Sequence, residues 1–138
     1  MTRLYLDAST IIYLTEGNKP FTVPTKRRVL QHLDDPQAKV LTSRLSRLEC
    51  RVLPLRERDQ ELLAEYDRFF TGERLELFDI TPDLIERATE LRARYRFKSP
   101  DAIHLATALK HGADAVLTGD PEWQRCDEIA VEVVRRET

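Results

Sequence analysis

Short apolar runs along the chain alternate with longer segments in which apolar residues recur every three or four positions. The short runs, which are typical of buried strands, are residues 4–6, 40–42, 75–80, 114–118 and 130–134. Strands that alternate with helices indicate a parallel sheet with helices on both faces. We therefore expect an α/β fold of three α/β/α layers, in which helices flank a central, mainly parallel sheet.

Helical spacing fills the connections between these strands. The helices are expected around Ile11–Leu14, between 22–25 and 34–36, from the cap Ser43 through Val52, at 56–70, from Asp83, and from the cap Ser99 to Gly112. The apolar faces are expected at Val29, Leu30 and Leu33 in the second helix and at Leu45, Leu48 and Val52 in the third. In the fourth helix, Tyr66, Phe69 and Phe70 form either core or a homodimer surface.

Composition narrows the class of protein. A chain of 138 residues fits a single domain over residues 1–138, and 41% apolar with 33% charged residues indicates a folded, helix-rich protein. A net charge of −2 provides no overall attraction for nucleic acid. Cys50 and Cys126 lack metal-binding spacing. No signal-peptide pattern or membrane-length apolar run is found, so we expect a reduced, cytoplasmic protein.

Acidic residues follow two of the expected strands. Asp7 comes directly after the apolar run 4–6, and Asp120 follows the run 114–118 within a Gly-Asp-Pro turn. Ligands of parallel α/β folds bind at the carboxyl ends of the strands. Helix capping by Asp7, Ser9 or Thr10, and turn formation by Asp120, remain alternative explanations.

Two further acids lie on helices that enter the same edge of the sheet. Glu49 follows the second strand, and Asp101 lies in the first helical turn after Ser99 and Pro100. Taken alone, Glu49 is typical of an exposed helical glutamate, and Asp101 is favoured by the helix dipole. His104, one turn after Asp101, is interpreted as a structural hydrogen-bonding residue rather than a metal ligand.

The topology can bring these four acids together. Clustered carboxylates repel one another unless a cation neutralises them. Hard oxygen ligands suit Mg²⁺ or Mn²⁺, and such ions can activate water during phosphodiester cleavage. The pattern is therefore compatible with a metal-dependent nuclease.

Four stretches resemble, in this order, the motifs of PIN-domain ribonucleases, and especially those of VapC toxins from bacterial and archaeal toxin–antitoxin pairs. The stretches are LYLDASTII, the glutamate-containing SRLSRLECR, SPDAIHLATAL and VLTGDPEW. The resemblance spans nearly the whole chain. It implies a PIN fold and a Mg²⁺- or Mn²⁺-dependent endoribonuclease that cleaves structured RNA such as tRNA or rRNA.

The resemblance also implies roles for individual residues. Asp7 and Asp101 match the principal metal-binding acids, and Glu49 and Asp120 match the second and fourth acids of the catalytic cluster. The positions that match supporting hydroxyls are Ser9 and Thr118. In the last motif Gly119 stands where the family usually has Asn, so we expect Asp120 to be held less firmly than the other acids.

Partners follow from the same resemblance. Such toxins usually form homodimers and are inhibited by a small VapB-like antitoxin, which itself binds operator DNA. No membrane partner is expected, and DNA would be contacted only through the antitoxin. The face formed by Tyr66, Phe69 and Phe70, together with the first helices, is the hypothesised contact surface.

Other classes fit the sequence less well. A haloacid dehalogenase-type phosphatase needs a second Asp two residues after the first, where this chain has Ser9. A phospho-receiver domain needs paired early acids and a late Lys after a strand, and no phosphate-binding glycine motif is present. The remaining alternative is a catalytically silent PIN scaffold that binds protein or RNA.

Overall fold

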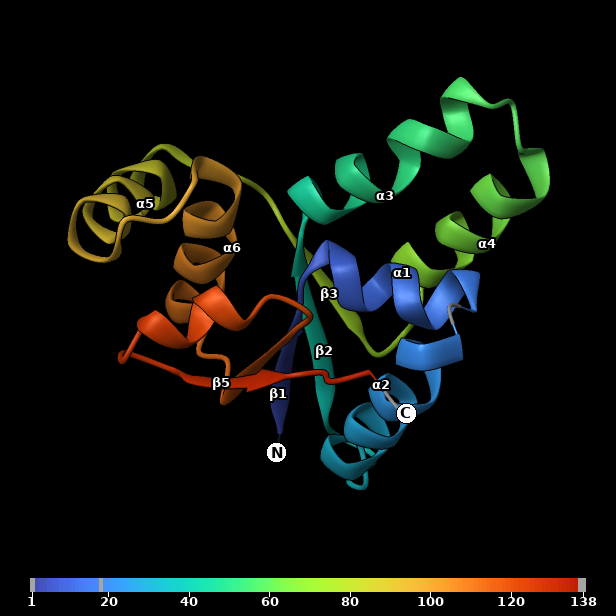
Figure 1. The fold of residues 1–138 in the computed structure, drawn as a ribbon, viewed down its shortest axis with the longest axis horizontal. Helices are drawn as coiled ribbons and strands as arrows, with labels where there is room; N and C mark the ends of the chain where they lie inside the picture. The colour runs from blue at the N-terminus through green and yellow to red at the C-terminus, as the bar shows by residue number, and fades with distance from the viewer. Residues whose placement is uncertain (1, 18, 137–138) are drawn as a thin grey trace.

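A fully parallel sheet forms the centre of the molecule (Figure 1). Within the residues that the computed structural model describes, 2–17 and 19–136, the sheet has five strands in the spatial order β3-β2-β1-β4-β5. The strands are β1 (Arg3–Leu6), β2 (Lys39–Ser43), β3 (Leu75–Phe78), β4 (Ala115–Thr118) and β5 (Ala130–Val133). The predicted α/β class is confirmed, with every strand pair parallel.

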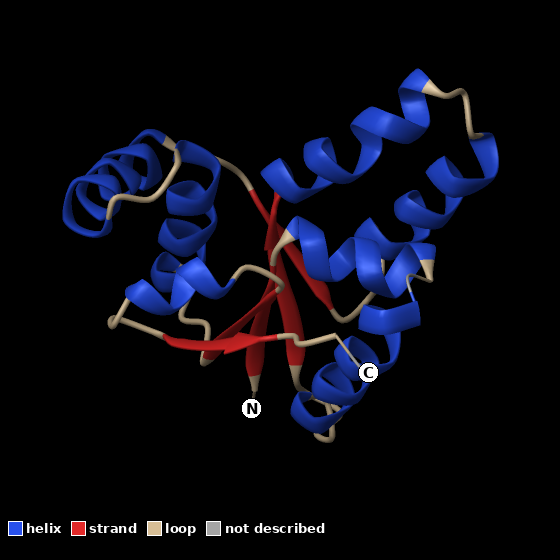
Figure 2. Cartoon of the chain, viewed as in Figure 1, coloured by secondary structure: helices blue, strands red, loops and turns tan. Residues whose placement is uncertain are grey.

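Helices cover both faces of this sheet (Figure 2). The helices are α1 (Ala8–Glu16), α2 (Lys19–His32), α3 (Arg44–Arg56), α4 (Gln60–Phe70), α5 (Pro82–Tyr95) and α6 (Ser99–Lys110), followed by the 3₁₀ helix η1 (Pro121–Arg125). The pair α5 and α6 lies on one side, and α1 to α4 lie on the other (Figure 1). No helix in the described part of the chain has the length and apolar character that a membrane span requires.

Strand β1 divides the core in two. Its side chains alternate in direction, as those of any strand do. Leu4 and Leu6 therefore pack into the cluster shared with α1 and α4, whereas Tyr5 packs with α5, α6 and η1. All three side chains are fully buried, so β1 anchors both helical layers.

The strand order reverses beside β1. The chain proceeds from β1 to β2 and β3 on one side, then returns to place β4 and β5 on the other. The carboxyl ends of β1 and β4 therefore flank the topological switch point, where open α/β sheets bind their ligands. Asp7 and Asp120 follow these two strand ends.

Three predicted helix boundaries are wrong. The helix expected at 56–70 begins at Gln60, because Arg56 ends α3 and the Asp59 carboxylate accepts a hydrogen bond from the Leu62 N–H at 3.1 Å and so caps α4. Helix α2 begins at Lys19, so 22–25 lies within it rather than before it. Lys98, not Ser99, is the N-cap of α6, and the Ser99 hydroxyl instead accepts a hydrogen bond from Arg92.

The predicted apolar face of α3 is also wrong. Leu48 and Val52 are 59% and 43% exposed, and the buried residues are Ser46, Cys50 and Pro54. These three recur every four positions, so the small residues, not the larger apolar ones, lie against the protein.

The core alternative for the aromatic face of α4 is correct. Tyr66 and Phe70 are buried, and Phe69 is packed against the same core cluster. This face is therefore core, which argues against its hypothesised role as a contact surface for a partner. Leu30 of α2, which was expected in the core, is 70% exposed.

Candidate functional site

The acids predicted from the sequence line one pocket of about 400 Å³. We call it the acid pocket and define it by Asp7, Glu49, Asp101 and Asp120. Asp7 and Asp120 come from the ends of β1 and β4, Glu49 from α3, and Asp101 from the first turn of α6. Segments far apart in sequence thus contribute carboxylates to the same cavity.

Asp7 is the most firmly held of these acids. Ser9 Oγ lies 2.7 and 2.9 Å from its two carboxylate oxygens. The Thr10 N–H and hydroxyl each donate to Oδ1 at 3.0 Å, and Thr118 Oγ1 donates to Oδ2 at 2.6 Å. A carboxylate that is only 6% exposed needs such partners to offset its lost hydration. The hydroxyls of Ser9 and Thr118 therefore support Asp7 directly.

The capping explanation for Asp7 is also correct. Its side chain accepts the Thr10 N–H at the start of α1 and is the N-cap of that helix. Capping and pocket lining do not compete, because a carboxylate oxygen can accept more than one interaction. Asp7 therefore caps α1 and lines the acid pocket at the same time.

Glu49 is held by a buried histidine. His104 Nε2 lies 2.7 Å from Glu49 Oε1, and His104 Nδ1 lies 2.7 Å from the Tyr5 hydroxyl. His104 is 3% exposed, whereas the Glu49 side chain is 33% exposed and reaches into the pocket. The interpretation of His104 as a structural hydrogen-bonding residue is confirmed, and its partner is one of the acids.

Asp101 has no comparable support. Burial raises the pKa of this carboxyl, and the negative charges of Asp120 and Asp7 raise it further, while Trp123 and His104 lower it. Trp123 Nε1 lies close enough to affect the carboxyl, but it is buried and has no partner of hydrogen-bonding geometry in the described residues. Burial and the like charges outweigh the effects of Trp123 and His104, so the pKa of Asp101 stays above its ordinary value.

Asp120 is held by backbone contacts. Its Oδ1 accepts the Glu122 N–H at 2.9 Å and caps η1, and its own N–H donates to Thr118 Oγ1 at 3.1 Å. The expectation that Asp120 would be loosely held therefore receives no support from these contacts. Thr118 links it to Asp7, since its hydroxyl meets both residues.

The glycine before Asp120 makes room for a tyrosine. A Cβ atom on Gly119 would lie 2.5 Å from Tyr13 Oη and 3.1 Å from Tyr13 Cε2. The ring of Tyr13 stacks on Phe21 at 4.5 Å, which limits how far it can move. Tyr13 therefore occupies space beside the acid pocket that a side chain at position 119 would need.

The acid pocket has the donor chemistry for a hard divalent cation. Its carboxylates suit Mg²⁺ or Mn²⁺, and Asp101 accepts no hydrogen bond from the described residues that would compete with a metal. Residues 2–17 and 19–136 contain no group of three or more His, Cys, Asp or Glu side chains already spaced to hold an ion. The acids fit such a cation in kind, and binding would draw them closer together.

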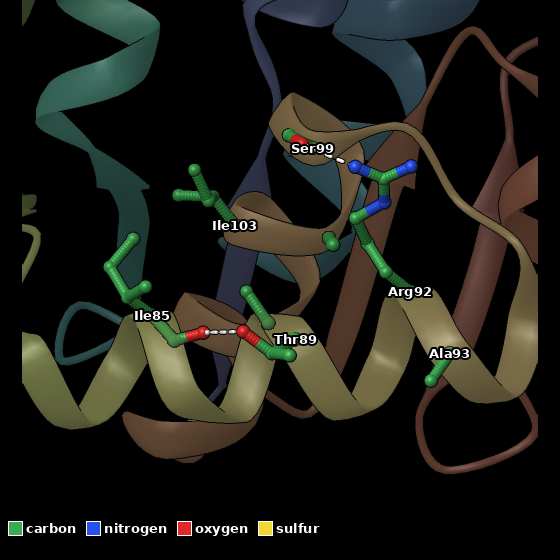
Figure 3. A pocket seen from close by; sticks show the side chains of 8 residues that line it. Ile85, Thr89, Arg92, Ala93, Ser99 and Ile103 are labelled. Atoms are coloured by element: carbon green, nitrogen blue, oxygen red, sulfur yellow. Dashed lines mark hydrogen bonds between the residues drawn. The ribbon is translucent and has the colours of Figure 1, made fainter.

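A second cavity, of about 470 Å³, lies between α5 and α6 (Figure 3). Its walls are mostly aliphatic, with Ile85 and Ile103 among them. Its polar side chains already take part in hydrogen bonds within the protein. Arg92 donates to Ser99 Oγ at 2.8 Å, and the Thr89 hydroxyl donates to the Ile85 backbone carbonyl at 2.9 Å. It lacks the convergent free polar groups that a reaction needs, so the acid pocket is the better candidate for chemistry.

A family model described as the PIN domain matches residues 4–129. This chain belongs to the PIN-domain family. The match extends over the acid pocket and nearly the whole sheet, which agrees with the resemblance seen in the sequence. No curated protein sequence matches the chain.

Solved structures of VapC-containing complexes share this PIN fold. VapBC2 from Rickettsia felis, bound to a promoter DNA fragment, superposes with a TM-score of 0.75 at 14% identity, covering 96% of this chain and 99% of that one. DNA-bound VapBC from Salmonella typhimurium gives 0.73 at 21% identity, with 96% and 98% covered. VapC20 from Mycobacterium tuberculosis, a sarcin–ricin loop cleaving toxin, gives 0.66 at 22%, with 82% and 86% covered.

Sequence reasoning missed several residues of this site. Thr10 was considered only as a helix cap, although a hydroxyl three residues after Asp7 is well placed to bond it. Tyr13 had no recognisable signal, because its position depends on a glycine 106 residues away. Tyr5 was predicted only as part of a strand, and no role in the site was predicted for Trp123, yet both contact the ring of His104.

The raised pKa of Asp101 predicts a stability change. Between the ordinary aspartate pKa, about 3.9, and the raised value, the folded state binds more protons than the unfolded state, so stability falls as pH rises. We expect Asp101→Asn to have a higher free energy of unfolding than the wild type at pH 7 without metal, and the gain to vanish below about pH 4. Urea unfolding over this pH range measures it.

Asp83→Asn is the opposite control. Lys110 and Thr81 lower the pKa of Asp83 to about 2 by hydrogen bonding, so its charged form stabilises the fold at neutral pH. Its removal should not raise stability at pH 7. A loss of stability at pH 7 in Asp101→Asn would contradict the electrostatic account of that carboxyl.

The packing of Gly119 against Tyr13 predicts coupling between the two positions. Gly119→Ala should lower the free energy of unfolding by about 1–3 kcal/mol, because the new methyl group displaces the stacked Tyr13 ring. In a Tyr13→Leu background, the loss caused by Gly119→Ala should be smaller by at least about 1 kcal/mol. Urea unfolding of the four proteins gives the coupling energy, and additive costs would show that Tyr13 does not limit position 119.

Proposed function

We propose that this PIN domain is a metal-dependent endoribonuclease toxin of the VapC type, which cleaves a phosphodiester bond in structured RNA. The observation that supports this proposal most strongly is the acid pocket. Four carboxylates, from the ends of β1 and β4 and from α3 and α6, line this one cavity at the topological switch point. Such a concentration of negative charge repels an RNA phosphate by itself. A divalent cation bound there would reverse that effect.

PIN nucleases generally use divalent metal ions. Asp7 and Asp101 are the residues proposed to hold Mg²⁺ or Mn²⁺, with Glu49 and Asp120 as the further acids of the site. When bound, the ion would supply a water of lowered pKa and neutralise charge on the cleaved phosphate. Asp7 contributes a carboxylate fixed by Ser9, Thr10 and Thr118, so its orientation is set before metal or RNA arrives.

The basic residues before α6 support an RNA substrate. Arg96 and Lys98 are exposed, and among the described residues neither side chain takes part in an ion pair. They precede Asp101 by only a few positions, so cations lie beside the acids that would act on the RNA. Arg94, by contrast, pairs with Glu128 at 3.4 Å and stabilises the fold. VapC20 is described as cleaving the sarcin–ricin loop, and we propose a structured RNA of similar complexity here.

An antitoxin is the proposed regulator, and α3 is its proposed contact surface. The exposed apolar residues of this helix are Leu48, Val52, Leu53 and Leu55. The same helix carries four arginines and a single acid, but Arg44, Arg47 and Arg51 pair with Asp79 or Asp67, so the proposed contact with an antitoxin segment is mainly apolar. Structural neighbours of this chain were solved as toxin–antitoxin complexes. Because Glu49 lies on α3, a segment bound along this helix would also reach the acid pocket.

We further propose a single-domain, cytoplasmic protein that forms a homodimer.

The nuclease proposal predicts metal-dependent cleavage that requires Asp7. Purified antitoxin-free protein should cut total cellular RNA with Mg²⁺ or Mn²⁺ and stop with EDTA. Asp7→Asn should lower the rate at least about a hundredfold, because it removes the fixed charge of the site. Gel analysis and mapping of the cut ends measure the rate and identify the RNA.

Glu61→Gln is the matched control, since Glu61 is an exposed acid on α4 outside the acid pocket. It should cut as fast as the wild type. A folded wild type that is as inert as Asp7→Asn would favour the catalytically silent scaffold, and cleavage that ignores both EDTA and Asp7→Asn would be a contaminant.

The α3 surface predicts which substitutions weaken antitoxin binding. Leu48→Asp and Leu55→Asp should each weaken capture of the co-expressed antitoxin at least about tenfold, because each puts a charge into the apolar contact. Ile85→Asp is the control, because Ile85 is an exposed apolar residue on a different helix, α5. It should leave antitoxin binding unchanged. Calorimetry measures the affinity of each variant for the antitoxin, and light scattering measures the oligomeric state of each variant alone. If Leu48→Asp and Leu55→Asp bind the antitoxin normally but no longer form a homodimer, α3 is a surface for self-association instead.

A further inference from the structure

A buried chain of hydrogen bonds runs from the centre of the sheet to the acid pocket. It starts at the Tyr5 hydroxyl in β1, passes through both ring nitrogens of His104 in α6, and ends at Glu49 Oε1 in α3. Both links are 2.7 Å long. Three elements that are distant in sequence thus meet through one imidazole ring.

The His104 ring is fixed by its surroundings. The Tyr5 ring meets it edge-on at 5.9 Å, and the Trp123 ring lies 5.7 Å away at an angle of 34°. Tyr5, His104 and Trp123 are all buried. A ring held on both sides presents Nε2 in one direction, which is toward Glu49.

The hydrogen bonds also determine the tautomer of His104. The Glu49 carboxylate can only accept a hydrogen bond, so the 2.7 Å contact to His104 Nε2 requires a proton on Nε2. The Tyr5 hydroxyl lies 2.7 Å from Nδ1, and the side chains of Thr42 and Thr107 also interact with this hydroxyl. A buried O–H group needs an acceptor, and the short contact favours a lone pair on Nδ1. Both ends of the chain therefore favour the tautomer with its proton on Nε2.

We propose that His104, oriented by Tyr5, is a positioning residue that holds Glu49 in the acid pocket. This role rests on the proposed function of the acid pocket. The Glu49 side chain is 33% exposed, so without His104 it would sample several rotamers in solvent. One oxygen is bound to Nε2–H, and the other is left for the site.

His104 would support the site from outside it. Its Nε2–H donates to one oxygen of Glu49, so it would fix the direction of that carboxylate. Outer partners that orient a ligand in this way typically change metal affinity about tenfold to a hundredfold when they are removed. His104 would thus raise the affinity of a site that it does not itself ligate.

The first test is the tautomer, which is measured without metal or RNA. Nitrogen-15 NMR of the histidine rings at neutral pH, with the His104 signals assigned from His104→Gln, should show a protonated Nε2 and an unprotonated Nδ1. Tyr5→Phe should shift the Nδ1 signal. An Nδ1–H tautomer, in which Nε2 has no proton to donate to Glu49, would overturn the proposal.

The second test is the affinity for Mn²⁺ alone, measured by calorimetry on folded variants. His104→Leu should bind Mn²⁺ about tenfold or more weakly, and His104→Gln, whose amide N–H can reach Glu49, should restore most of the affinity. In a Glu49→Gln background, His104→Leu should cause no further loss. A general structural defect would lower affinity in both backgrounds, and that result would overturn the positioning role.

RNA cleavage by the same variants separates the two proposals. If the wild type binds Mn²⁺ in a His104-dependent way but does not cut RNA, the nuclease proposal fails and the role of His104 stands. If the wild type cuts RNA and His104→Leu matches it in both Mn²⁺ affinity and rate, the role of His104 fails alone. A wild type that binds no Mn²⁺ would overturn the inference.

Discussion

The buried carboxylate of Asp7 is the constraint on which the rest of the structure depends. A charge that is 6% exposed is tolerated only with several hydrogen-bond donors. Those donors come from the start of α1 and from the end of β4, through Ser9, Thr10 and Thr118. The same bonds therefore cap a helix, join two central strands and orient a carboxylate. The geometry of the acid pocket and the packing of the sheet cannot be changed independently here.

The two helical layers serve different purposes around that constraint. The α5–α6 layer supplies Asp101 and His104 from α6, a helix whose middle is almost entirely buried. The opposite layer contributes Glu49 from α3, a helix that keeps small residues inward and large apolar residues outward. One layer thus holds the site in shape. The other offers the same site a surface through which a second protein could control it.

Local patterns predicted the sheet and the two acids at its strand ends, whereas Glu49 and Asp101 were singled out only together with them and through the resemblance to the PIN motifs. A buried strand that ends in Asp7 or Asp120 is visible in a few residues, and the parallel topology follows from the alternation of elements. The faces of α3 and α4 could not be predicted in this way. Periodicity shows that residues share a side, but it does not show which side meets the core, so Leu48 was misplaced. The pairing of Tyr13 with Gly119 depends on tertiary contact and leaves no local pattern.

The link between Asp7 and Thr118 spans 111 positions of the chain. During synthesis β1 leaves the ribosome well before β4. Until β4 emerges, the carboxylate of Asp7 has no Thr118 to bond, and β1 lacks one of its two neighbours. The acid pocket therefore forms only after both strands are available. A nascent or truncated chain that ends before β4 cannot form it, so the site is incomplete at every earlier stage of synthesis.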